Sequence, residues 1–155
     1  MDYNAMIQNN SVDFGQMMPA PFLIGLLSAF ENRFQTVADS FFEEITWKQF
    51  FAIICINLCR ESPTINELSE VMGSSHQNVK QILLKLEKKG FVEMIADEKD
   101  RRKQRIVTTK KCEDFCQRND QGSKIQMNKI FEGISQEQLI TTIQTISQME
   151  RNLKK

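Results

Sequence analysis

The fold of this chain is decided by residues 64–111, which read TINELSEVMGSSHQNVKQILLKLEKKGFVEMIADEKDRRKQRIVTTKK. Thr64, followed three residues later by Glu67, forms the capping-box pattern that starts a helix. Ser75 can cap a second helix, which Gly90 ends. A short helix, a tight turn and a longer helix in direct succession predict a helix-turn-helix.

Two strand-like runs follow the second helix, at 91–95 and 105–109, and the charged residues 96–103 lie between them. Short strands joined in this way predict a β-hairpin with a long exposed tip. A helix-turn-helix followed by a charged hairpin is a winged helix-turn-helix, whose second helix fits the major groove of DNA and reads base edges there. The polar outer face of the predicted helix carries suitable residues: Ser75, His76, Gln77, Asn78, Lys80 and Gln81.

The sequence on both sides of this stretch predicts helices only. Residues 19–42 begin with two prolines and then carry apolar side chains at helical spacing. Thr46 and Ser135 each precede a glutamine by three residues, which is again the capping-box spacing. Another helix begins near Thr109, and Gly122 within it indicates a bend. The predicted fold class is therefore mainly α with a small β-hairpin wing.

The stretch resembles the MarR family of transcriptional regulators. Residues 64–73 are similar to that family's supporting helix, and residues 75–90 are similar to its recognition helix. Asp-Arg-Arg at 100–102 and Thr-Lys-Lys at 109–111 follow the family's wing without a gap. The flanking helices fit the family's dimerisation layer, so the resemblance covers most of the chain after position 19.

The resemblance implies roles for the wing. Arg102 would enter the minor groove at the wing tip, and Asp100 would hold the tip conformation. The chain departs from the family at Met94 and Ile95, where two arginines are common, and at Cys112, where the family has glycine. Candidates for phosphate contacts, or for simple solvation, are Lys85, Lys88, Arg101, Lys103 and Arg105.

The outer helices predict a homodimer, because one small winged-helix core cannot cover all of their apolar stripes. A two-fold dimer would bind a pseudo-palindromic site in double-stranded DNA, with half-sites about one helical turn apart. The expected division of the chain is an N-terminal arm at 1–18, a dimerisation helix at 19–45, the DNA-binding domain at 46–109 and C-terminal dimerisation helices at 110–155.

The overall charge at first argues against DNA, because 20 Lys+Arg balance 20 Asp+Glu. Residues 73–111, however, hold 11 of the Lys+Arg and only 5 of the Asp+Glu. Neutrality is therefore the sum of a basic segment and an acidic remainder. No apolar run reaches the ~18 residues of a membrane span, and the first residues lack the basic start of a secretory signal. We therefore expect a cytoplasmic protein with no membrane partner.

The cysteines form two pairs with helical i, i+4 spacing, Cys55 with Cys59 and Cys112 with Cys116. This spacing places both thiols of a pair on one helix face but does not suit a disulfide. Free cysteines usually act as small apolar core residues, which is the interpretation we favour. The alternative is a thiol- or metal-responsive regulator in which all four converge.

The MarR resemblance also implies a small aromatic or amphipathic ligand, bound between the dimerisation layer and the DNA-binding domain. The aromatic residues expected near it, unless they are ordinary core, are Phe30, Phe34, Trp47, Phe51 and Phe115. No glycine-rich phosphate loop or nucleophile beside the single histidine supports an enzyme, and no cofactor is expected. The predicted function is a ligand-released repressor, and a further alternative is a winged-helix protein-interaction module without DNA binding.

Overall fold

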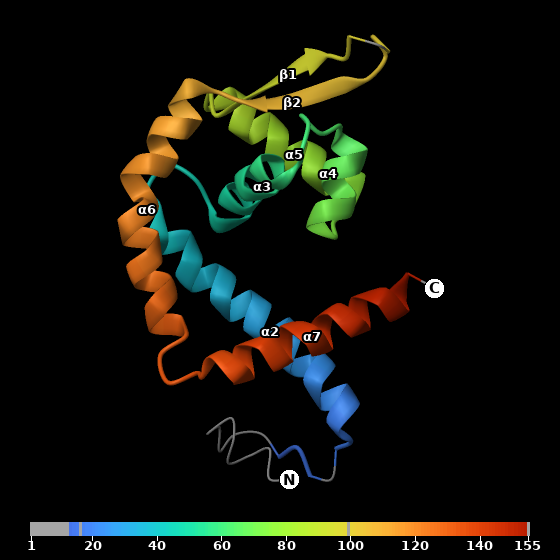
Figure 1. Ribbon diagram of the computed structural model, residues 1–155, viewed down its shortest axis with the longest axis vertical. Helices are drawn as coiled ribbons and strands as arrows, with labels where there is room; N and C mark the ends of the chain where they lie inside the picture. The colour runs from blue at the N-terminus through green and yellow to red at the C-terminus, as the bar shows by residue number, and fades with distance from the viewer. Residues whose placement is uncertain (1–12, 16, 99, 155) are drawn as a thin grey trace.

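The computed structural model describes residues 13–15, 17–98 and 100–154, and the arm predicted at 1–18 lies mostly outside them. A two-stranded antiparallel hairpin is set among helices, which confirms the predicted fold class (Figure 1). The elements are α2 (Pro19–Ala38), the short 3-10 helix η1 (Asp39–Phe41), α3 (Trp47–Leu58), α4 (Ile65–Met72), α5 (His76–Lys88), β1 (Val92–Ala96), β2 (Gln104–Thr108), α6 (Lys110–Ile130) and α7 (Gln136–Leu153).

Side-chain caps confirm the predicted helix starts. The Thr46 hydroxyl accepts the Gln49 N–H at 3.4 Å, and the Gln49 side chain accepts the Thr46 N–H at 3.2 Å. The same reciprocal capping box opens α4 and α7. Ser75 caps α5 by accepting the N–H of Asn78 at 3.3 Å. These caps satisfy N–H groups that have no partner inside the helix, and so they fix where each helix begins.

The strands lie one residue away from the predicted positions, at 92–96 and 104–108. The Phe91 N–H donates to the Leu86 carbonyl at 2.9 Å, so Phe91 closes the end of α5 instead of opening β1. Gly90 has a φ of +75°, the left-handed conformation in which glycine commonly ends a helix. The helix predicted from Thr109 continues through Gly122 as one α-helix.

Helices α3, α4 and α5 pack with the hairpin into a winged-helix lobe, defined here as residues 46–109 (Figure 1). Its core is fully buried and draws on all of these elements, together with the first turns of α6. The largest completely buried side chains include Ile53, Leu68, Leu83, Leu86, Phe91, Ile106 and Phe115. The recognition-type helix and the hairpin are therefore held rigidly against each other.

Helices α2, α6 and α7 extend away from this lobe and form what we call the helical layer (Figure 1). Helix α2 buries only Phe22 and Ala38, and α6 buries only Cys112 and Phe115. Among the 18 described residues of α7, none is buried. None of the helices in the described part of the chain is long and apolar enough to cross a membrane.

Candidate nucleic-acid interface

Helix α5 separates an apolar face from a polar one. Val79, Ile82, Leu83 and Leu86 are buried against the lobe core. The residues predicted to read bases all lie on its exposed side: Ser75, His76, Gln77, Asn78, Lys80, Gln81 and Lys85. Asn78 is held in place by its side-chain N–H group, which donates to the Ser74 hydroxyl at 2.8 Å. The helix thus presents donors and acceptors to solvent from a fixed backbone.

The wing tip is organised around Asp100. Its carboxylate accepts the Arg102 N–H at 3.2 Å and the Arg102 Nε at 3.1 Å. These bonds from Arg102, the side-chain one first, lower the pKa of Asp100. The Lys103 N–H closes the turn by donating to the Asp100 carbonyl at 2.8 Å. The structure therefore places Asp100 where the resemblance expects it, under an Arg102 side chain that is 91% exposed.

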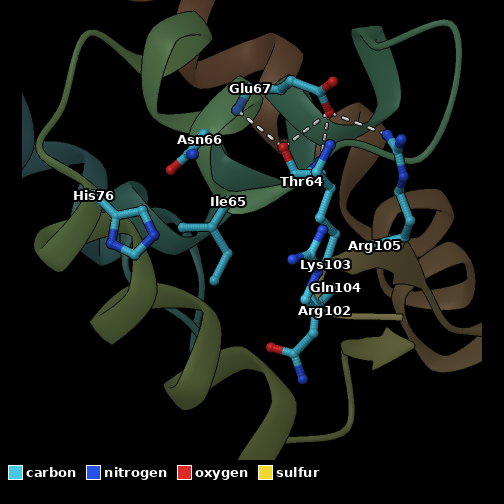
Figure 2. A pocket seen from close by; sticks show the side chains of 9 residues that line it. All are labelled: Thr64, Ile65, Asn66, Glu67, His76, Arg102, Lys103, Gln104 and Arg105. Carbon is cyan, nitrogen blue, oxygen red and sulfur yellow. Dashed lines mark hydrogen bonds and ion pairs between the residues drawn. The ribbon is translucent and has the colours of Figure 1, made fainter. Parts of the chain in front are cut away.

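A cleft of about 460 Å³ lies between the helix-turn-helix and the wing (Figure 2). One side is formed by the start of α4 and by His76, and the other by β2 and the residues before it. Figure 2 shows Ile65 between His76 and the wing side chains. The lining residues are Thr64, Ile65, Asn66, Glu67, His76, Arg102, Lys103, Gln104 and Arg105.

Asn66 and Gln104 are cleft residues that the sequence did not single out. Both are exposed and polar, but they are 38 positions apart and belong to different elements. Only the packing of the hairpin beside α4 brings them together. The one available signal was their place next to residues already chosen, since Gln104 directly follows Lys103.

Arg105 lies in a network of its own at the base of the wing. Its Nε donates to the Asp97 carboxylate at 2.5 Å, and its Nη1 donates to the Glu67 carboxylate at 3.1 Å. The same Nη1 reaches the Ser62 carbonyl at 3.0 Å. These partners, Asp97 above all, raise the pKa of Arg105. Arg105 is thus neither a simply solvated residue nor a guanidinium left open for a phosphate.

Glu67 serves both the start of α4 and this network. Its carboxylate accepts the Thr64 N–H at 2.7 Å and the Thr64 hydroxyl at 3.0 Å. These two bonds are the main reason why the pKa of Glu67 is lowered, and the charges of Arg105 and Lys103 add to the effect. The carboxylate therefore stays ionised wherever the wing cations need it.

The four cysteines are free thiols. Cys55 and Cys112 are buried, while Cys59 and Cys116 are partly buried. Burial raises the pKa of Cys55 and of Cys116, and it raises the pKa of Cys112 to about 12. A thiol with so high a pKa is a poor nucleophile at neutral pH. Within the described residues, no three His, Cys, Asp or Glu side chains gather as a metal site would require.

The aromatic residues proposed for a ligand occupy two places. Phe30 stacks on Phe34 with ring centroids 5.8 Å apart, and Phe34 meets Trp47 edge-on at 4.8 Å. Phe115 is instead 2% exposed within the core, and Phe51 packs against that core. An apolar slot of about 240 Å³ is lined by Phe30, Arg33, Phe34, Val37 and Ile130, so two of the five proposed residues border it.

Comparison with known proteins identifies the domain. Residues 45–103 match the model of the MarR family. A MarR protein from Peptoclostridium difficile superposes with a TM-score of 0.77 at 16% identity, over 94% of this chain and 95% of its own. MepR of S. aureus, solved in complex with DNA, gives a TM-score of 0.73 at 17% identity, over 88% and 99% of the two chains.

An organohalide-sensing transcriptional regulator in its 2,4-dichlorophenol-bound form is similar as well, with a TM-score of 0.77 at 13% identity. The match covers 91% of this chain and 85% of that regulator. At these identities the structural likeness shows a shared fold.

Proposed function

We propose that this chain, in which residues 45–103 form a MarR-family domain, is a transcriptional regulator that binds double-stranded DNA. One observation carries the proposal: His76 of α5 and Arg102 and Lys103 of the wing line a single cleft. Helix and wing can therefore engage one duplex together. Residues 73–111 hold 11 Lys+Arg against 5 Asp+Glu, which suits a polymer with a negative charge about every 1.7 Å of its axis.

In this proposal α5 enters the major groove and Arg102 enters the adjacent minor groove. The sugar–phosphate backbone between the two grooves would then pass over the cleft, where Asn66, Lys103 and Gln104 are available to it. Lys85 and Arg101 are exposed and are assigned to phosphates. Base-edge contacts are assigned to the polar face of α5: Ser75, His76, Gln77, Asn78, Lys80 and Gln81.

The active species is proposed to be a homodimer formed through the helical layer, with 19–45 and 110–155 as its dimerisation segments and 46–109 as the DNA-binding part. Support comes from apolar side chains that remain exposed on this layer, such as Phe30, Ile125 and Ile143, which are between 50% and 57% exposed. Contiguous exposed apolar surface marks an interaction site. A two-fold dimer presents two α5 helices and two wings to a pseudo-palindrome.

The regulator is proposed to act as a repressor that occludes a promoter and is released by a small aromatic or amphipathic ligand. The ligand-bound relative, which carries 2,4-dichlorophenol, supports this ligand class. The apolar slot beside Phe30 and Phe34 is its proposed site, and Arg33 at the edge offers a charge to an acidic ligand group. A ligand there would change the spacing of the two lobes and so weaken operator binding.

The test is selection of bound sequences from random duplex DNA, followed by titration of the selected operator. We expect a pseudo-palindrome whose half-sites lie about one helical turn apart. Arg102→Ala should lower operator affinity at least about tenfold per dimer, since one good contact is worth roughly 1–3 kcal/mol. Lys85→Ala should instead weaken all sequences alike and flatten the dependence on salt.

Arg151→Ala is the matched control, because Arg151 is an exposed arginine on α7 whose side chain bonds only within its own helix at Gln148. It should bind the operator like the unmodified protein. Failure of the unmodified protein to enrich any duplex at about 50 mM salt, where electrostatic attraction is strong, would contradict the DNA-binding proposal and favour a protein-interaction module.

A further inference from the structure

We propose that Arg105 is a positioning residue for DNA recognition, which fixes the wing tip relative to the helix-turn-helix without itself contacting DNA. The inference rests on the function proposed above and adds a residue to which that proposal gives no role. It is drawn from a series of hydrogen bonds that runs from the wing tip, through Asp97 and Arg105, to the first turn of α4.

The first part of this series lies within the wing. The Asp97 side chain is buried, and one of its carboxylate oxygens accepts the Asp100 N–H at 2.8 Å. The other oxygen accepts Arg105 Nε at 2.5 Å. The Asp97 N–H also donates to the Lys103 carbonyl at 3.0 Å, across the loop. Because Asp100 holds Arg102 directly, Asp97 joins the DNA-facing tip to Arg105.

The second part of the series leaves the wing. Arg105 Nη1 donates to the Glu67 carboxylate at 3.1 Å and to the Ser62 carbonyl at 3.0 Å. Glu67 belongs to α4, and its carboxylate is already fixed by the Thr64 cap (Figure 2). The Ile106 N–H adds a backbone bond to the Pro63 carbonyl at 2.9 Å. The wing base is thereby tied to the segment that starts α4.

The charges around Arg105 explain why it should not act as a phosphate contact. Its guanidinium lies between two carboxylates, Asp97 and Glu67, and its side chain is 27% exposed. Its donors already point at protein oxygens. Its positive charge is therefore compensated inside the protein, and its removal should leave the number of released counterions unchanged. Removing a residue that binds a phosphate directly would instead lower the salt slope by about 0.9.

The geometry also explains why this position needs arginine. The guanidinium uses Nε toward Asp97 and Nη1 toward Glu67 and Ser62, so its planar fork spans two elements at once. A lysine has one compact ammonium group on a flexible stem and cannot hold both directions in a fixed plane. Arg105→Lys should therefore keep the charge but abolish the positioning.

The experiment is a double-mutant cycle on operator affinity with the full chain, combining Arg102→Ala with Arg105→Ala. We expect Arg105→Ala to weaken operator binding about as much as Arg102→Ala, on the order of tenfold. In the Arg102→Ala background, Arg105→Ala should cost less than about twofold, because the tip that it positions no longer carries the side chain that enters the groove. The salt slope of Arg105→Ala should equal that of the unmodified protein.

Two further variants guard against a mere loss of folding. Glu67→Gln keeps a capping-box residue at the start of α4 but removes the charge that faces Arg105, and it should lower operator affinity about threefold. Glu70→Gln removes the same charge from the exposed side of α4 and should have no effect. Thermal unfolding and circular dichroism establish that each variant is folded.

Additive effects of Arg102→Ala and Arg105→Ala, or a reduced salt slope for Arg105→Ala, would overturn the positioning role while leaving DNA binding intact. Full operator affinity of Arg105→Lys would also overturn it, since charge alone would then suffice. Absence of duplex binding by the unmodified protein would contradict the proposed function itself, so the two failures are distinguishable.

Discussion

Two helices from different parts of the molecule show how its two regions are stabilised. Helix α5 in the winged-helix lobe has 13 residues and buries four of them, Val79, Ile82, Leu83 and Leu86. Helix α7 in the helical layer is longer, with 18 residues described, and buries none. Both helices are well capped at the start. The difference teaches that the lobe is completed by its own chain, whereas the layer leaves apolar surface for something else to cover.

The largest expected effect comes from a charge on the exposed stripe of the layer. Ile143 of α7 is 54% exposed, and Ile143→Lys should block formation of the proposed homodimer. Operator affinity should then fall by about 10²–10⁴, because two linked half-site contacts become independent ones. Sedimentation velocity measures the association state, and titration of the operator measures the affinity.

Thr141→Lys is the matched control for this change. Thr141 is an exposed residue of the same helix, and two positions along an α-helix place it on roughly the opposite side. It should leave both the association state and the affinity unchanged. A dimer that survives Ile143→Lys would move the interface away from this face of α7 and weaken the contrast between the two regions.

The next largest effect compares one truncation in both regions. Phe91 is completely buried in the lobe, so Phe91→Ala should lower the free energy of unfolding by about 3–5 kcal/mol at every protein concentration. Phe30 in α2 is 50% exposed, and Phe30→Ala should cost roughly 1 kcal/mol or less in dilute protein. Chemical denaturation of both variants at two concentrations makes the comparison.

For Phe30→Ala the cost should grow as the protein concentration rises, because a side chain at a subunit interface stabilises only the associated state. Phe91→Ala should show no such dependence. Equal costs for the two variants in dilute protein would mean that the helical layer is as complete as the lobe, which would remove the basis for the dimer.

The sequence predicted the helix starts in both regions because each cap depends on two residues that lie three positions apart. Thr46, Thr64 and Ser135 could be assigned without any knowledge of tertiary structure. The strand ends were displaced because Phe91 is taken by the end of α5, a competition that composition alone does not settle. Local chemistry was therefore readable, while the choice between two local possibilities needed packing.

The candidate site was predictable to a similar extent. The exposed face of α5 and the Asp100–Arg102 turn follow from local spacing and from the family resemblance. The partners of Arg105 did not, because Glu67 lies 38 positions away and the connection depends on how the hairpin packs beside α4. A cation in a charged loop cannot reveal from sequence whether it faces solvent, a phosphate or a distant carboxylate.

The two regions meet at a polar joint around Glu44, in the segment before α3. Its carboxylate lies 3.4 Å from Arg118 Nη2 and 3.7 Å from Lys111 Nζ, both on α6. The Glu44 carbonyl accepts Lys89 Nζ from the end of α5 at 2.6 Å. Lys111 Nζ also donates to the Lys89 carbonyl at 2.8 Å and lies over the Phe91 ring. Charged contacts thus supplement the apolar packing between lobe and layer.

The smallest expected effect comes from this joint. The carboxylate of Glu44 is 44% exposed, so Glu44→Gln should lower the free energy of unfolding by less than about 1 kcal/mol, as is usual for exposed ion pairs. The difference from the unmodified protein should disappear at about 1 M salt, where the screening length is about 3 Å. Glu43→Gln, an exposed neighbour, is the control and should change nothing. A loss of more than about 2 kcal/mol, or one that persists in high salt, would mean that the joint is as rigid as the lobe. Lobe and layer would then form one mechanical unit, and a ligand in the slot beside α2 could no longer alter the spacing of the two lobes without unfolding them.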